Sequence, residues 1–238
     1  MLRRGLVFLS VIPLVMGVFV SPPVSAQQTL NFFVGGFVPR SLSARDTSDV
    51  LFQDSFLASG GSLVFNSVDF RGPTVGGEYI VGLNDRLDAG LSIGFYSRSV
   101  HAIDADFENP DGSDIVSTLA LRMVPITATF RFLPLGHHDA FEPYIGAGVA
   151  IVNWRYTESG DFVDTSNNNN IFTGSFKASG TEVGPVILGG VRVPIGSAGI
   201  GGEIRYQRAT GKLPADQFAP TTIDLGGVSY LFTISKRF

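Results

Sequence analysis

The chain has 238 residues, enough for one domain, and it contains no cysteine, which excludes a disulfide framework and a thiolate metal site. Only 16% of the residues are charged, the formal net charge is −4, and no basic run occurs, so a nucleic-acid partner is not expected. Glycine and phenylalanine are abundant, at 29 and 20 residues.

Residues 1–26 predict a cleaved secretory signal peptide, which leaves 27–238 as the mature domain. Arg3 and Arg4 form a positive start, an apolar run follows, and Val24-Ser25-Ala26 fits a small-residue cleavage site. The apolar run has about fifteen residues, whereas a membrane-spanning helix needs roughly twenty. No later stretch reaches about eighteen consecutive apolar residues, so a membrane role must come from strands that close into a barrel.

Eight later segments alternate between apolar and polar side chains, as strands with two different faces do. The segments are 29–38, 74–83, 87–99, 115–132, 141–156, 181–195, 200–209 and 222–238. Asn84-Asp85-Arg86 predicts a hairpin turn between the second and third segments. A change of parity at Val124-Pro125 predicts a β-bulge in the fourth, because proline is tolerated at bulges.

The connections alternate between long and short. The long ones are 40–72, 100–114, 157–180 and 210–221, and the short ones are 84–86, 133–140 and 196–199. Outer-membrane barrels have an even strand number, short periplasmic turns and long outer loops. The sequence therefore predicts an all-β, transmembrane, eight-stranded antiparallel up-and-down β-barrel in the outer membrane of a Gram-negative-type envelope.

The sequence leaves two questions open, the structure of the long connection 40–72 and the side of the barrel wall that is apolar. The long connection 40–72 contains two apolar patches, around Leu51 and Val64, that predict a short helix or a hairpin standing above the membrane. A soluble barrel of lipocalin type would have the same strand order with its apolar face inside.

The last segment is expected to close the barrel by pairing with the first, and to be recognised by the barrel-assembly machinery. Its lipid-facing side is predicted to carry Tyr230, Phe232, Ile234 and the terminal Phe238. Aromatic residues at the ends of strands are typical of the lipid interface of such barrels.

The sequence resembles the eight-stranded outer-membrane barrels, the class that includes the barrel portion of OmpA and the small OmpW-like porins. The resemblance rests on the signal peptide ending at Ala26, the opening LNFFVGGFVPR (30–40), the segment PYIGAGV (143–149) and the terminal YLFTISKRF (230–238). It implies the architecture for the whole mature chain. It does not select a function, because the class includes plugs, narrow pores, adhesion proteins and a few enzymes.

Nine charged side chains are predicted to face the lumen. They are Glu78, Asp88, Arg98, Arg122, Arg131, Arg155, Arg192, Glu203 and Arg205. Three acids and three bases fall in the lower half, whereas Arg98, Arg122 and Arg155 fall in the upper half without an acid. Such a lumen is either a paired polar core or a narrow pore whose positive mouth favours anions.

That assignment depends on the parity of 141–156, where small residues blur the pattern. We expect Tyr144, Val152, Trp154 and Tyr156 to point outward and Asn153 and Arg155 inward.

No catalytic residue, cofactor site or metal site is predicted. His137 and His138 are adjacent, but a solvated periplasmic turn is favoured over a metal site. His101, with Ser97 or Ser99 and Asp104, could form a lipid-hydrolase group, although a polar loop explains these residues equally well.

The predicted function is therefore a structural or narrow-pore outer-membrane barrel without enzymatic activity. The alternatives are an outer-loop binding or adhesion protein and, third, a lipid hydrolase. The expected partners are outer-membrane lipid and lipopolysaccharide, and the expected state is a monomer.

Overall fold

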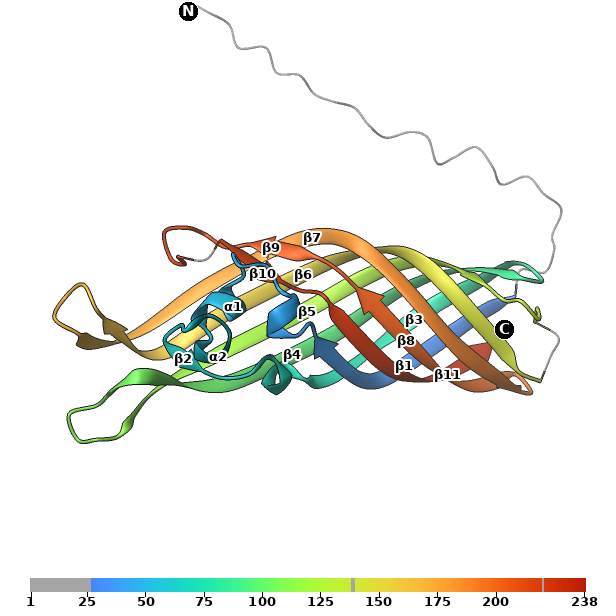
Figure 1. The fold of residues 1–238 in the computed structure, drawn as a ribbon. Coiled ribbons are helices and arrows are strands. Elements are labelled where there is room, and N and C mark those ends of the chain that lie inside the picture. Colours follow the sequence, from blue (N-terminus) through green and yellow to red (C-terminus); the bar gives the residue numbers. More distant parts are fainter. Residues whose placement is uncertain (1–26, 138–139, 220) are drawn as a thin grey trace, which may run out of the picture.

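The chain folds into a closed barrel of eight antiparallel strands. The computed structural model describes residues 27–137, 140–219 and 221–238, so the predicted signal peptide lies outside the described residues. The ring runs β1–β3–β4–β5–β6–β7–β8–β11, and β11 pairs with β1, which leaves the ring without a free edge (Figure 1). The predicted fold class and the predicted closure are thereby confirmed.

The ring strands are β1 (Gln28–Pro39), β3 (Gly72–Asn84), β4 (Leu87–Glu108), β5 (Asp114–Phe132), β6 (Glu142–Asp164), β7 (Asn170–Ile195), β8 (Ala198–Gln207) and β11 (Gly227–Arg237). The shorter elements are η1 (Leu42–Ala44), α1 (Val50–Asp54), α2 (Phe56–Ser59), β2 (Leu63–Val64), η2 (Ser67–Phe70), β9 (Thr210–Lys212) and β10 (Thr222–Asp224). Within the described ranges, no helix is long and apolar enough to cross a membrane.

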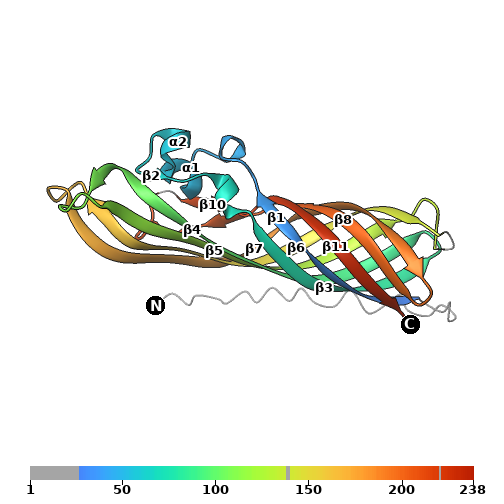
Figure 2. The same ribbon diagram turned by 90° about the horizontal axis from the view of Figure 1, so that it is seen from below.

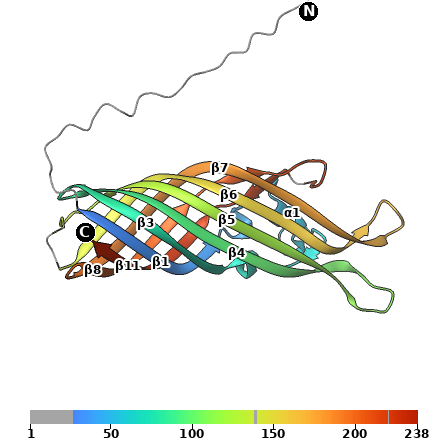
Figure 3. The ribbon, with the colours of Figure 1, turned by 180° about the vertical axis from the view of Figure 1, so that it is seen from behind.

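Four strands, β4 to β7, extend well above the other four, and three of them, β4, β6 and β7, are much longer than the prediction. Most of the predicted loops 100–114 and 157–180 is strand, because β4 continues to Glu108 and β7 begins at Asn170. At about 3.3 Å per residue the 26 residues of β7 span about 85 Å, whereas a membrane crossing takes about 9–11 residues. Figures 1 and 3 show these strands extending as a wall beyond the other four.

The outer surface of the lower half is an apolar band to which all eight ring strands contribute. The band includes Phe32, Val34, Val75, Tyr79, Leu91, Ile93, Ile126, Phe130, Ile145, Ile151, Val183, Ile187, Ile200, Ile204, Tyr230, Phe232 and Ile234, each more than two-fifths exposed. Large apolar side chains on every strand need lipid around them. Tyr230, Phe232, Ile234 and Phe238 all point outward, as predicted for the closing strand.

The upper half of the barrel has the opposite arrangement, with an apolar interior and a polar exterior. Val152, Trp154 and Tyr156 of β6 are at most 2% exposed and lie in one core with Leu121 and Met123 of β5. Val152, Trp154 and Tyr156 were predicted to point outward, and this prediction is wrong. It is also wrong for Tyr144, which is 4% exposed and faces the lumen. The physical reason is that the outside of this half is water, so its apolar residues face inward.

The predicted β-bulge at Pro125 is also absent from the described β5–β6 ladder. Pro125 pairs with Val152, and the register is unbroken from Ser117 to Phe132. Odd-numbered residues of β5 therefore face inward along the whole strand. The apparent change of parity in the sequence reflects a change of surroundings from water to lipid.

The segment between β1 and β3 fills the mouth of the barrel on its short side (Figure 2). Val50, Leu51, Phe65 and Phe70 are at most 4% exposed and join the apolar core. One predicted alternative, a short helix, occurs as α1, but it packs into the barrel instead of standing above it. The second patch forms β2, which pairs with β4 at Leu63 and Val64.

The β9–β10 hairpin covers the same core from the β7–β8 side. Gly211 lies so close to the Trp154 ring that an added Cβ would be 2.5 Å from Cζ2. A glycine is required there because the backbone of the hairpin lies directly on the indole.

Candidate functional site: a lumen closed at two levels

A buried ion network occupies the lower lumen, inside the apolar band. Arg131 lies at its centre, with Nη2 donating to both carboxylate oxygens of Glu78 at 2.7 Å and to Oε2 of Glu203 at 2.8 Å. Arg205 donates from Nε to Oε1 of Glu203 at 2.9 Å. These four side chains are between 1% and 7% exposed, so each charge is compensated by neighbouring protein groups instead of by water.

Neutral groups complete this network. The Tyr144 hydroxyl donates to Oε2 of Glu203 at 3.0 Å, and the Asn31 amide donates to Oε2 of Glu78 at 3.3 Å. The Tyr144 ring also lies 4.9 Å from the Arg131 guanidinium, close enough for a cation–π contact. The carboxylates are therefore held by hydrogen bonds as well as by charge, which fixes their geometry.

A second ion cluster lies at the periplasmic end of the lumen. Asp88 is 3.2 Å from Nη2 of Arg192 and 2.9 Å from Nε2 of His137. Glu142 is 3.5 Å from Nε of Arg192 and also forms an ion pair with Arg237. The prediction of a solvated turn is wrong for His137, whose side chain is 9% exposed, and His138 lies outside the described residues.

Together these two clusters set four carboxylates against four arginines across the lumen. The carboxylates are Glu78, Asp88, Glu142 and Glu203, and the arginines are Arg131, Arg192, Arg205 and Arg237. An eight-stranded barrel is only wide enough for its own side chains to fill. The lower lumen is thus a charge-balanced core.

Six of the nine predicted lumen charges lie in this core: Glu78, Asp88, Arg131, Arg192, Glu203 and Arg205. The prediction is wrong for Arg122 and Arg155, whereas Arg98 has the inward parity of Tyr96 and Val100 but is not buried in the lumen. Arg122 and Arg155 are exposed on the outer wall, and Arg98 is exposed at the edge of β4, where Nε donates to the Asp69 carbonyl at 2.9 Å. The prediction required a polar interior along the whole barrel, but the interior is polar only where lipid surrounds the barrel.

Three further lumen residues were not predicted from the sequence: Asn31, Glu142 and Tyr144. A usable signal was present in β6, because even-numbered residues from Val152 to Tyr156 share one face with Glu142 and Tyr144. Placing an acid and a tyrosine hydroxyl next to the inward arginines would have assigned the correct parity.

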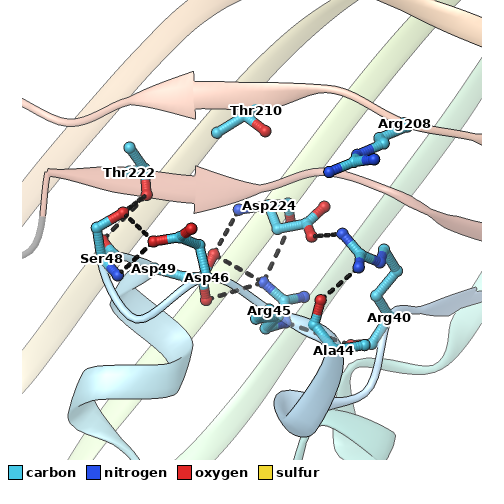
Figure 4. Close-up of a pocket in the computed structure, with 10 residues that line it drawn as sticks. All are labelled: Arg40, Ala44, Arg45, Asp46, Ser48, Asp49, Arg208, Thr210, Thr222 and Asp224. Atoms are coloured by element: carbon cyan, nitrogen blue, oxygen red, sulfur yellow. Dashed lines mark hydrogen bonds and ion pairs between the residues drawn. The ribbon is translucent and has the colours of Figure 1, made fainter.

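The upper closure is held by a polar junction, the extracellular latch, formed by Arg40, Arg45, Asp49 and Asp224 (Figure 4). Arg45 Nη1 donates to Oδ1 of Asp49 and to the Asp224 carbonyl, both at 3.1 Å. Arg40 Nη1 lies 2.6 Å from Oδ2 of Asp224, and the Asp224 amide donates to Asp49. The latch ties the start of the 40–72 segment to β10, beside a cavity of about 380 Å³.

The residues considered for a lipid-hydrolase group are arranged differently from a catalytic triad. His101 Nδ1 lies 3.2 Å from the Thr118 hydroxyl, on an exposed part of the wall. Asp104 accepts the backbone N–H groups of Asp106 and Phe107, as in a local turn.

Known proteins resemble this chain in fold but not in sequence. No protein-family model matches the sequence, and no curated protein matches it. The crystal structure of the outer-membrane protein OprG from Pseudomonas aeruginosa matches over 90% of this chain and 96% of that chain, with a TM-score of 0.54 and 12% identity. The chain has the fold of the eight-stranded outer-membrane barrels.

Two further solved barrels match with lower TM-scores. Neisserial surface protein A aligns over 89% of this chain and 97% of its own, with a TM-score of 0.47 and 14% identity. The outer membrane protein W of E. coli aligns over 90% and 98%, with a TM-score of 0.40 and 16% identity.

The location of the protein follows from its own surface and fold. The apolar band on all eight strands requires a bilayer, and the backbone groups of the ring are paired within the closed sheet. The protein is an integral outer-membrane barrel.

Proposed function

We propose that the protein is a closed, non-conducting barrel that anchors a rigid structure at the extracellular side of the outer membrane. The observation that supports this proposal is the double closure of the lumen. Arg131 and its carboxylate partners fill the lower level, and the core around Leu51 and Trp154 fills the upper level. Ions would have to break both levels to pass.

This arrangement favours the structural role over the narrow pore. An anion-selective mouth needs inward cations at the entrance. Of the three arginines expected to supply them, Arg122 and Arg155 lie on the outer wall, and Arg98 is exposed and donates to the Asp69 carbonyl. The inward side chains at that level are apolar, such as Met123 and Trp154.

Conductance in planar bilayers tests the proposal. The protein is first shown to be folded by a heat-dependent gel shift, and we then expect no channel steps at any voltage. Reproducible single-channel steps from folded wild-type protein would refute the closed barrel.

Two variants test the two levels separately. In the first, a flexible linker of about ten residues replaces 47–68, which removes the upper closure. In the second, Glu78→Ala is combined with Arg131→Ala, which removes the centre of the lower network as a pair. Each variant alone should remain silent, and the combined variant should conduct. Conductance in either single-level variant would show that the other level does not close the lumen.

A second candidate function is binding by the extracellular extension. The β6–β7 hairpin is stiffened by an aromatic series in which Phe162 lies 5.9 Å from Phe172 and 5.2 Å from Phe176, between ring centroids. Replacing residues 161–173 by a Gly-Ser turn should preserve folding and abolish attachment of displaying cells to at least one of a panel of lipid, glycan and cell surfaces. Equal attachment by both chains on every surface would refute this candidate.

A further inference from the structure

Two arginines face each other directly on the outer wall of the barrel. Arg122 of β5 and Arg155 of β6 are cross-strand partners, and both are exposed. Side chains in such pairs have Cβ atoms about 4.5–5.5 Å apart, and like charges at that separation repel each other. Neither arginine forms an ion pair with any acid in the part of the chain that the structure describes.

The surroundings of this pair supply further hydrogen-bond donors. A cavity of about 280 Å³ is lined by Arg122, Asn153, Trp154, Arg155, Ser179, Gly180 and Thr181. Asn153 Nδ2 lies 3.2 Å from the Thr181 hydroxyl, and the Arg122 guanidinium lies 5.3 Å from the centre of the Phe95 ring. No carboxylate lines the cavity, so its two positive charges and its hydroxyls suit an anion with several oxygens.

The outer wall next to the cavity also carries hydroxyl, amide and basic side chains. Further from the membrane the same face carries the acids Asp114 of β5 and Asp161 of β6, and apolar residues such as Val116 and Ala120 also lie on it. Closer to the cavity, its polar outward-facing positions on β4 to β7 carry serine, threonine, asparagine, arginine, lysine or histidine. These positions are Ser97, Ser99 and His101 on β4, Thr118 and Arg122 on β5, Asn153, Arg155, Thr157 and Ser159 on β6, and Ser175, Lys177, Ser179 and Thr181 on β7. The part of the wall next to the cavity therefore favours anions over cations.

The height of Arg122 and Arg155 above the apolar band indicates the source of the anion. Ile126 and Ile151, at the upper edge of the apolar band, lie four residues below Arg122 and Arg155 and are 44% and 46% exposed. With strands tilted about 40°, four residues correspond to a rise of about 10 Å. Headgroups occupy roughly 5–8 Å beyond each side of the hydrocarbon core, within reach of an arginine side chain pointing down. The pair thus lies at the level of the lipid headgroups in the outer leaflet.

We propose that Arg122 and Arg155, with Asn153 and Thr181, bind a phosphate group on the headgroup of an outer-leaflet lipid. The phosphate would neutralise the facing guanidinium groups and accept hydrogen bonds from both. This inference is independent of the closed lumen, because it concerns the outer wall only. The Arg40 and Arg45 side chains of the extracellular latch differ, since Asp224 and Asp49 already compensate them.

The test measures lipid binding to the purified, folded barrel by native mass spectrometry. The probes are lipid A with two phosphates, lipid A with both phosphates removed, and inorganic phosphate. The double variant Arg122→Gln/Arg155→Gln is compared with wild type. The matched control Arg208→Gln/Lys212→Gln removes the same charge from exposed positions on the β8–β9 side.

We expect the double variant to bind the phosphorylated lipid at least about tenfold more weakly than wild type and the control, as loss of charged hydrogen bonds predicts. Equal binding by the double variant, or equal binding of both lipids by wild type, would overturn the proposal. Displacement of the lipid by an equal concentration of inorganic phosphate would assign the site to a soluble anion and overturn it also.

The lipid-free protein provides a second measurement that does not depend on the probe. Because the substitution removes a repulsion, the double variant should show a heat-shift midpoint at or above that of wild type. A lower midpoint would contradict the argument that the bare pair is unfavourable.

Discussion

Glu203→Ala tests the lower closure, because Glu203 joins three other side chains in the lumen. Its Oε2 accepts from Arg131 at 2.8 Å and from Tyr144 at 3.0 Å, and its Oε1 accepts from Arg205 at 2.9 Å. The substitution removes these bonds and leaves the four arginines of the lumen facing three carboxylates.

The size of the stability loss depends on the contacts that Arg131 and Arg205 retain after the substitution. Removing one member of a buried pair costs about 3–5 kcal/mol, since the other charge is left uncompensated. Arg131 keeps both oxygens of Glu78 at 2.7 Å. Arg205 keeps a 3.1 Å hydrogen bond to the Ser92 hydroxyl, but its remaining carboxylate contact is the 3.9 Å approach to Glu78. We therefore expect Glu203→Ala to lower the free energy of unfolding by the lower end of this range, about 3 kcal/mol. For a chain of this size that loss lowers the unfolding midpoint by about 6–12 °C.

The assay is the midpoint of the heat-dependent gel shift of the purified barrel. Glu108→Ala, at the exposed end of β4, is the control and should change stability by less than about 0.5 kcal/mol. Adding Arg205→Leu to Glu203→Ala should recover part of the loss, because the uncompensated charge is removed with its side chain. A midpoint unchanged by Glu203→Ala would refute the paired-core reasoning.

Three further predictions concern the upper closure. Burial and the neighbouring Glu158 carboxyl raise the pKa of Asp54 to about 8, so its contribution to stability is full below about pH 4 and is lost as the pH rises through about 8. Asp54→Asn should flatten the decline of the heat-shift midpoint between about pH 4 and pH 8, and equal slopes would contradict this assignment. Gly211→Ala should push the hairpin off Trp154, the only tryptophan, at a cost of about 1–3 kcal/mol and with a red-shifted emission; an unchanged spectrum would argue against the close packing. Leu51→Ala should cost about 2–5 kcal/mol and speed proteolysis within 40–72, because Leu51 is fully buried; an unaltered rate of cleavage would show that the segment is not held by this core.

The alternation of apolar and polar side chains was sufficient to predict the architecture and to assign the inward residues of the half that lies in lipid. On β3, β4 and β8, glycine, serine and charged residues alternate with large apolar ones, and this alone placed Glu78, Asp88, Glu203 and Arg205 inward. The reason is that lipid outside and a filled polar lumen inside impose opposite requirements on neighbouring residues. The strand count and closure followed from the same pattern and from loop lengths.

The upper half could not be assigned in the same way, because alternation reports that two faces differ and not which face is inside. Trp154 and Arg155 alternate equally well with either one buried. Which of them faces inward is decided by the surroundings, and these depend on how far the strands continue above the membrane.

What the sequence alone determined is therefore an eight-stranded barrel with a polar lumen at the level of the lipid. Only the tertiary structure decided that segment 40–72 enters the mouth, that Val50 and Leu51 join β5 and β6 in one apolar core, and that Arg122 and Arg155 face outward. The physical reason is that these choices depend on contacts between parts of the chain about 70 or more residues apart, which no local period encodes.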